Sequence, residues 1–91
     1  MIEVLKITEE IFQVTVIKDS KTIHEITLLE KFYNDLSDSK VSKVSKVELI
    51  QKSFEFLLER ESNQSILRKF NLEDIEGYFP DYPTLIKNYF N

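Results

Sequence analysis

Three carboxylates lie close together near the C-terminus, at Glu73, Asp74 and Glu76. Carboxylates in such a cluster could act as a general acid–base pair or bind a cation. Asn71 precedes them in the position of a helix N-cap, so the acids would occupy a first helical turn, where the helix dipole stabilises negative charge. We therefore interpret the cluster as a helix start rather than as a catalytic or metal site.

Few other residues suggest chemistry. His24 is the only histidine, and it falls in a predicted strand with no evident partner for acid–base catalysis. Ser20 and Ser62 lie in no nucleophile motif, and the chain has no cysteine. The sequence has no glycine-rich phosphate loop, EF-hand spacing or HExxH motif. These observations predict a protein that is not an enzyme and that has no cofactor and no metal ion.

The composition indicates one small globular domain. The chain has 91 residues, of which 42% are hydrophobic and 31% charged, and its formal net charge is −4. A negative chain is a poor general binder of nucleic acid or anionic membranes, because such binding depends on Lys and Arg. No apolar run approaches the ~18–20 residues of a membrane span, and the N-terminus lacks the pattern of a secretory signal. We therefore expect a cytoplasmic protein that does not bind membranes.

The first third of the chain has the composition of β-strands. Residues 2–7, 11–18 and 22–28 are rich in β-branched side chains. A three-residue loop at residues 19–21 would sort the last two strands into an apolar and a polar face. The facing pairs would be Lys18 with Thr22, Val16 with His24, Val14 with Ile26 and Phe12 with Leu28. The apolar face would carry Phe12, Val14, Val16, Ile26 and Leu28.

Residues 45–61 are the best-defined helix of the sequence. Ser45 and Glu48 have the spacing of a capping box, and one apolar stripe follows at helical spacing: Val47, Ile50, Phe54, Leu57 and Leu58. Leu49 and Phe56 fall near the opposite side. A helix that is apolar on two sides is usually covered on both. Either a second copy or a partner covers Leu49 and Phe56, or the C-terminal helices of the same chain do.

A biased segment precedes this helix. Residues 39–47 repeat the tripeptide Ser-Lys-Val three times, after a short helix predicted at residues 29–36. Such a repeat is typical of a solvated loop that grew by duplication, because lengthening a loop costs little chain entropy. The alternative is a basic loop in which Lys40, Lys43 and Lys46 contact phosphate groups or an acidic partner.

Shorter helices are predicted after residue 61. Ile66, Leu67 and Phe70 continue at helical spacing after a break at residues 62–63. Gly77, the only glycine, would end the next helix in the left-handed conformation.

An aromatic turn, YFPDYP at residues 78–83, leads into the last predicted helix. Asp81 can cap this helix, and its apolar face is Leu85, Ile86, Tyr89 and Phe90. We predict that Phe79 is a buried plug and that Pro80 stops the preceding helix. The alternative is a recognition surface that includes Tyr78 and Tyr82, because exposed aromatic residues anchor interfaces.

Together these elements predict an α+β domain over residues 1–91. An N-terminal antiparallel hairpin or three-stranded sheet would pack on the central amphipathic helix, with three or four helices in total. The β-sheet part would span residues 1–28 and the helical part residues 29–91, with a loop at residues 37–44.

One stretch resembles the ribbon-helix-helix fold of small repressors and antitoxins. It is HEITLLEKFYNDL, a strand running into a helix, followed by SKVELIQKSFEFLLERE. The resemblance implies a DNA-binding protein whose strand pairs with a partner's strand and whose outward strand residues read the major groove. Those residues would be Ile23, Glu25 and Thr27. The acid at Glu25 would repel phosphates, so Glu25 and the net charge both disfavour nucleic-acid binding.

A second pattern is similar to one in small bacterial proteins of unknown function. It reads SFEFLLERE, then SIL, then F-x-L-x-x-I-x-x-YFP-x-Y, and it runs from Ser53 to Tyr82. This resemblance implies a complete protein with an N-terminal hairpin, and it implies no activity.

The sequence therefore favours a non-enzymatic protein-interaction or regulatory module. The possible interface residues are Leu49, Phe56, Tyr78 and Tyr82, and we expect a protein partner or self-association. The alternative is a ribbon-helix-helix-like DNA-binding antitoxin or repressor.

Overall fold

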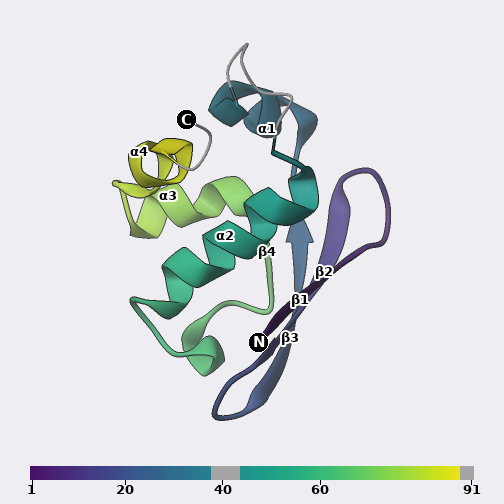
Figure 1. Cartoon of the computed structure of the whole chain (residues 1–91), viewed down its shortest axis with the longest axis vertical. Helices are drawn as coiled ribbons and strands as arrows, with labels where there is room; N and C mark the ends of the chain where they lie inside the picture. The colour runs from purple at the N-terminus through teal and green to yellow at the C-terminus, as the bar shows by residue number, and fades with distance from the viewer. Residues whose placement is uncertain (38–43, 89–91) are drawn as a thin grey trace.

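A four-stranded sheet forms one layer of the fold, and the helices lie against one of its faces (Figure 1). The computed structural model describes residues 1–37 and 44–88. Strands β1 (Ile2–Lys6), β2 (Ile11–Ile17) and β3 (Lys21–Thr27) are antiparallel, and β4 (Lys69–Asn71) runs parallel to β3. The helices are α1 (Glu30–Ser37), α2 (Lys46–Leu58), α3 (Ile75–Tyr78) and α4 (Tyr82–Lys87), with 3-10 turns η2 (Asn63–Ser65) and η3 (Leu72–Asp74). The predicted α+β class is confirmed. Most of the predicted loop at residues 37–44, and Tyr89 and Phe90, lie outside the described residues.

The faces of the sheet are as predicted, but the pairing of β2 with β3 is shifted by two residues. Phe12 faces Ile26 instead of Leu28, and the other pairs move in the same way. The loop therefore occupies residues 18–20 rather than residues 19–21. Because side chains alternate with a period of two, a shift of two residues leaves every side chain on its face. Sorting by polarity therefore could not distinguish the two registers.

The central helix begins where predicted and ends early. Ser45 is the N-cap of α2, and its hydroxyl accepts a hydrogen bond from the Glu48 N–H at 3.0 Å. The helix ends at Leu58 rather than at Glu61. The Glu61 N–H bonds to the Leu57 carbonyl at 2.9 Å, so the chain closes a last turn there before it leaves the helix.

The segment around Phe70 forms a strand, not the predicted helix. Phe70 of β4 lies opposite Ile26 of β3, and the Glu25 N–H donates to the Arg68 carbonyl at 2.7 Å. Ile66 is buried and Leu67 is exposed, whereas the predicted helical face would bury both. The part of the chain after residue 29 is therefore not wholly helical.

The position of β4 also matters for the ribbon-helix-helix resemblance. β3 pairs with β2 along one edge and with β4 at its C-terminal end along the other. The arrangement implied by that resemblance requires this strand to pair with a partner's strand. Here β3 is an interior strand, and both of its edges carry intrachain pairs.

The chain around the aromatic turn differs from the prediction in detail. Gly77 lies inside α3 instead of ending it, and α3 ends at Tyr78, before Phe79 and Pro80, as predicted for the proline turn. Phe79 is half-buried and packs on the edge of the core, so it is less enclosed than expected. Asp81 occupies the N-cap position of α4 without a side-chain cap hydrogen bond.

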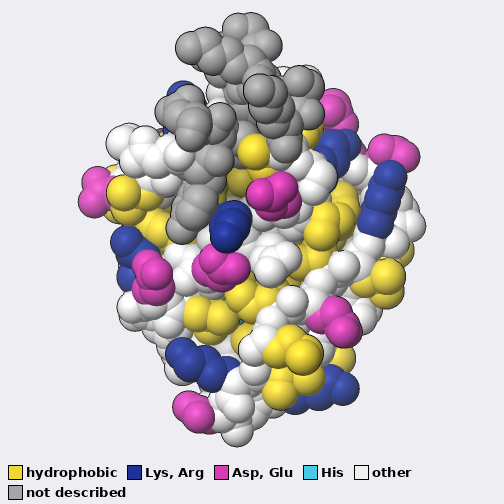
Figure 2. Space-filling model, in the orientation of Figure 1, with side chains coloured by type: hydrophobic (Ala, Val, Ile, Leu, Met, Phe, Trp, Pro, Cys, Tyr) yellow, Lys and Arg dark blue, Asp and Glu magenta, His cyan; other side chains and the backbone are white. Residues whose placement is uncertain are grey.

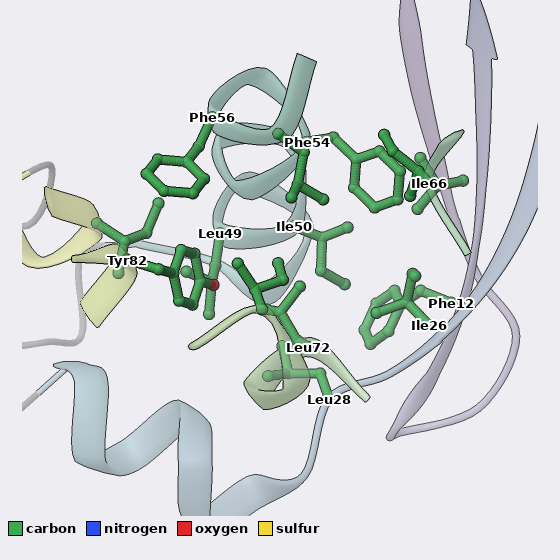
Figure 3. Close-up of a cluster of buried hydrophobic side chains, with 14 of the residues drawn as sticks. Phe12, Ile26, Leu28, Leu49, Ile50, Phe54, Phe56, Ile66, Leu72 and Tyr82 are labelled. Carbon is green, nitrogen blue, oxygen red and sulfur yellow. The ribbon is translucent and has the colours of Figure 1, made fainter. Parts of the chain in front are cut away.

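The core surrounds α2 on two sides (Figure 3). Toward the sheet, the ring of Phe54 lies 5.3 Å from the ring of His24 and 6.2 Å from that of Phe70. On the other side, the ring of Phe56 lies 5.4 Å from that of Tyr82 in α4. The helix therefore forms the middle of the domain, between the sheet and the C-terminal helices.

Candidate functional site

Three of the four predicted interface residues are buried within the chain. Leu49 is 1% exposed, Phe56 5% and Tyr82 0%. The prediction that Leu49 and Phe56 lie on an outer, uncovered side of the helix is wrong, because the C-terminal helices cover that side. The ring of Phe56 contacts those of Tyr82 and Phe79, with centroid distances of 5.4 and 5.8 Å. The alternative, in which the chain covers both sides of the helix, is the arrangement found.

Tyr82 is fixed by a buried hydrogen bond as well as by packing. Its hydroxyl lies 2.7 Å from the hydroxyl oxygen of Ser53, and Ser53 donates to the Leu49 carbonyl at 2.8 Å. The Ser53 proton is therefore used, and the Tyr82 hydroxyl is the donor between the two. Burial raises the pKa of Tyr82 above its usual value. This tyrosine is a structural residue that stays protonated.

The predicted basic loop is described at Lys46 alone, since Lys40 and Lys43 lie outside the described residues. The Lys46 ammonium forms an ion pair with Glu30 and donates to the Glu9 carbonyl at 3.2 Å. The hydrogen bond that Lys46 donates to the Glu30 carboxylate raises the pKa of Lys46. Lys46 thus joins the loop after β1 to the starts of α1 and α2, and its charge is already paired within the chain.

His24 is held in the core by both ring nitrogens. Nδ1 donates to the Leu67 carbonyl at 2.7 Å, and Nε2 lies 2.9 Å from the hydroxyl oxygen of Thr22. Asn63 donates to the same hydroxyl oxygen at 3.1 Å, which leaves the Thr22 proton for Nε2. These contacts specify a neutral imidazole, and burial lowers the pKa of His24. The histidine ties β3 to the segment that enters β4.

The carboxylate cluster forms a helix start, as the sequence indicated. Asp74 Oδ2 accepts a hydrogen bond from the Asn71 N–H at 3.1 Å, and Glu73 and Glu76 lie in the turns η3 and α3 beside it. Among residues 1–37 and 44–88, no group of His, Cys, Asp and Glu side chains has the arrangement of a metal site. The cluster thus caps the short helical turns that carry the aromatic turn.

An apolar hollow opens beside this cluster, between the C-terminal end of α2, the segment entering β4, and α3. Its volume is about 130 Å³. The hollow is lined by Leu57, Ile66, Phe70, Ile75 and Phe79, with the partly exposed Glu61 and the exposed Ser65, Leu67, Asp74 and Tyr78 at the rim. Leu67 and Tyr78 are 52% and 68% exposed. We name this site the apolar hollow.

A shallow depression adjoins the apolar hollow on the side of α3. Leu67, Asp74 and Tyr78 line both, and the depression adds Glu73, Glu76 and Gly77. Tyr78, the one predicted interface residue that is exposed, therefore lies where the two join. The large exposed ring and the hollow together form a surface that a partner can contact.

Exposed apolar side chains also lie on the outer face of the sheet. On the strands or next to their ends, the exposed apolar side chains are Met1, Leu5, Ile7, Ile17 and Ile23. Glu25 and Lys69 pair across β3 and β4 at 3.6 Å on this face. In the view of Figure 2, which shows one side of the molecule, apolar side chains are separated by charges of both signs. Antiparallel sheets commonly leave one face in water, so these residues by themselves indicate no partner.

Comparison with known proteins adds no assignment. No protein family, curated protein or solved structure matches this chain. Both resemblances noted in the sequence therefore remain predictions. Among the described residues, no helix is both long enough and apolar enough to cross a membrane. Function therefore has to be inferred from the geometry of the chain itself.

Sequence reasoning missed the apolar hollow because it missed β4. The sequence predicts Leu67 and Phe70 on one helical face, whereas in the structure Phe70 lies in β4, Leu67 precedes that strand, and both line the apolar hollow. Of the residues that line this site, Tyr78 is the one that the sequence indicates as an interface residue, because it is an aromatic residue next to the proline turn. Its surroundings depend on a strand pairing between residues far apart in sequence.

Proposed function

We propose that this protein is a non-enzymatic interaction module that binds a partner protein through the apolar hollow. The observation that carries the proposal is an open apolar site with an exposed aromatic ring, Tyr78, at its rim. Exposed tyrosines beside apolar pockets are typical anchors of protein interfaces. The partner would insert one apolar side chain into the apolar hollow and pack against Tyr78.

The size of the apolar hollow supports a single side chain as its occupant. Its volume is about 130 Å³. An apolar cavity of roughly 150 Å³ in another protein accommodates benzene, which is comparable to the ring of a phenylalanine. The occupant we propose is therefore one Phe, Leu or Met side chain presented by a peptide segment, rather than a large cofactor.

The state of the only histidine supports the non-enzymatic part of the proposal. General acid–base catalysis needs a group that can reach a substrate and exchange its proton. His24 is fully buried, and both of its ring nitrogens are hydrogen-bonded inside the core. Its position is that of a structural residue.

A displayed library of random peptides, selected on the immobilised protein, tests the proposal. We expect the selected peptides to share one large apolar residue at a fixed place. The double variant Leu67→Ser/Tyr78→Ala should weaken the binding of a selected peptide by about tenfold or more, because it removes both exposed apolar side chains of the rim. Fluorescence anisotropy of the labelled peptide gives the dissociation constants.

Leu5→Ser/Ile7→Ala is the matched control, because it removes two exposed apolar side chains that lie on and beside β1 and do not line the apolar hollow. We expect it to change the dissociation constant by less than about twofold. The opposite result, in which the control loses binding and the rim variant keeps it, would move the interface to the sheet. Failure to select any anchored peptide would also contradict the proposal.

A further inference from the structure

The ionisable groups around the apolar hollow all carry one sign of charge. Glu61 and Asp74 line the apolar hollow, and Glu73 and Glu76 line the depression next to it. No Lys or Arg among the described residues lines either one. The hollow itself is the binding site, and the four carboxylates restrict what can occupy it.

These carboxylates are available to a partner. No ion pair or side-chain hydrogen bond within residues 1–37 and 44–88 engages Glu61, Glu73 or Glu76. Asp74 uses Oδ2 to cap the Asn71 N–H and keeps Oδ1. Elsewhere on the molecule, Glu9, Glu25, Glu30, Glu55 and Glu59 each lie within ion-pair distance of a Lys or Arg. Acids without an ion pair also lie elsewhere among the described residues, as at Glu3 and Asp35, but those at the apolar hollow and the depression are the ones that surround an open apolar site.

We infer that the partner is a basic peptide segment, with Lys or Arg residues next to the apolar side chain that enters the apolar hollow. This inference rests on the proposed function and specifies the chemistry of the partner. Opposite charges at the edge of an interface guide association and select among partners, while the buried anchor supplies most of the affinity.

A second copy of the chain suits this surface less well than a basic peptide. Each copy has a formal net charge of −4, so two copies repel one another on approach. A peptide with lysines beside its apolar side chain instead brings positive charges. These can pair with the carboxylates of Glu61, Glu73 and Glu76. Charge complementarity therefore identifies a basic segment as the occupant.

Three short fluorescent peptides test the inference by anisotropy. The first has a phenylalanine flanked by lysines, the second has the same phenylalanine flanked by glutamates, and the third has alanine flanked by lysines. At about 0.05 M salt, we expect the lysine–phenylalanine peptide to bind about tenfold more tightly than the glutamate–phenylalanine peptide. At about 0.5 M salt, this difference should fall to about twofold or less, because salt screens exposed charges.

Reversing the charge of acidic residues on the protein distinguishes two effects on peptide binding. One comes from the acids at the site, and the other comes from the net charge of the whole protein. Glu73→Lys/Glu76→Lys should abolish the preference for the lysine–phenylalanine peptide. Glu3→Lys/Asp35→Lys makes the same change in net charge at two exposed carboxylates that line neither the apolar hollow nor the depression, and it should keep the preference. If the reversed variant is poorly folded, Glu73→Gln/Glu76→Gln should still reduce the preference by at least about threefold.

The outcomes distinguish this inference from the function on which it rests. Equal binding of the two phenylalanine peptides would contradict the inference of a basic partner. It would not contradict the proposed function as an interaction module. Equal loss of preference in the control and reversed variants would also overturn the inference, because the effect would then come from net charge. Equal binding of the alanine and phenylalanine peptides, or no binding by any peptide, would overturn the apolar hollow as the site and the proposed function with it.

Discussion

Two aromatic-lined spaces lie beside α2, and one is closed while the other is open. The first lies between α2 and α4, where the ring of Tyr82 fills the room next to Phe56 and is 0% exposed. The second is the apolar hollow, at the C-terminal end of the same helix. Phe79 contributes to both, since its ring contacts Phe56 and lines the apolar hollow. Aromatic rings line both spaces, and the spaces differ in whether a side chain of the described residues fills them.

The difference follows from the elements that form each space. α4 places Tyr82 directly over α2, and Ser53 provides a hydrogen-bond partner for the buried hydroxyl. The apolar hollow is bordered by β4 and α3, which have three and four residues. With α2 they form the walls, and no side chain of the described residues fills the space of about 130 Å³ between them.

Removing the occupant of the closed space should have the largest effect. We expect Tyr82→Ala to reduce the free energy of unfolding by about 3–5 kcal/mol, because it empties a fully buried site. Tyr82→Phe, which keeps the ring and loses the hydrogen bond to Ser53, should cost about 0.5–1.5 kcal/mol. Urea denaturation followed by circular dichroism measures both. A small loss for Tyr82→Ala would mean that the closed space is not part of the core.

Lowering the pH should destabilise the protein through His24, which donates a hydrogen bond to the carbonyl of Leu67 beside the apolar hollow. Burial lowers the pKa of His24 in the folded state below its usual value of about 6.5, so the unfolded chain binds a proton first as the pH falls. The stabilisation is complete above about pH 6.5 and is lost as the pH falls toward the folded-state pKa, by up to about 1.4 kcal/mol per pH unit. Urea midpoints measured between about pH 7.5 and about pH 5 should show this slope.

His24→Gln is the control for the pH effect, because glutamine is polar and does not titrate in this range. Its stability should be lower than that of the wild type near neutral pH and should fall less steeply with acid. An identical slope in the wild type and the variant would assign the pH dependence to carboxylates instead.

Gly77→Ala should stabilise the wall of the open space slightly. Gly77 lies inside α3, and a Cβ atom built there meets no atom within 4 Å. Alanine lowers the conformational entropy of the unfolded chain and favours the helix, so we expect a gain of about 0.5–1 kcal/mol. Thermal unfolding gives the change. A loss of stability would show that this position is strained or packed, contrary to the structure.

The smallest effect on stability is expected at the rim of the apolar hollow. Leu67→Ser and Tyr78→Ala each remove a side chain that is more than half exposed, so each should change the free energy of unfolding by less than about 0.5 kcal/mol. Urea denaturation of the two variants checks this. A cost of several kcal/mol for either would mean that the rim is core, and the contrast between the two spaces would disappear.

The sequence predicts the closed side of the domain better than the open side. The cap at Ser45, most of the apolar stripe of α2 and the inner face of β2 and β3 follow from local spacing and are present, but Val47 at the start of that stripe is 38% exposed. The exact pairing of β2 with β3 does not follow, because registers two residues apart sort the side chains identically. The covering of Leu49 and Phe56 was one of two alternatives in the sequence, and the position of Tyr82 decided between them.

By itself, then, the sequence determined the α+β class, the start of the central helix and the sides of the sheet, because backbone periodicity and capping act over a few residues. Only the tertiary structure decided that residues 69–71 form a strand, since three residues carry too little pattern and the pairing with β3 joins positions far apart in the chain. That pairing sets Leu67 and Phe70 opposite Leu57, Ile75 and Tyr78, and so creates the apolar hollow. A hollow formed by such long-range contacts is encoded in no single segment, which is why it is visible only in the folded chain.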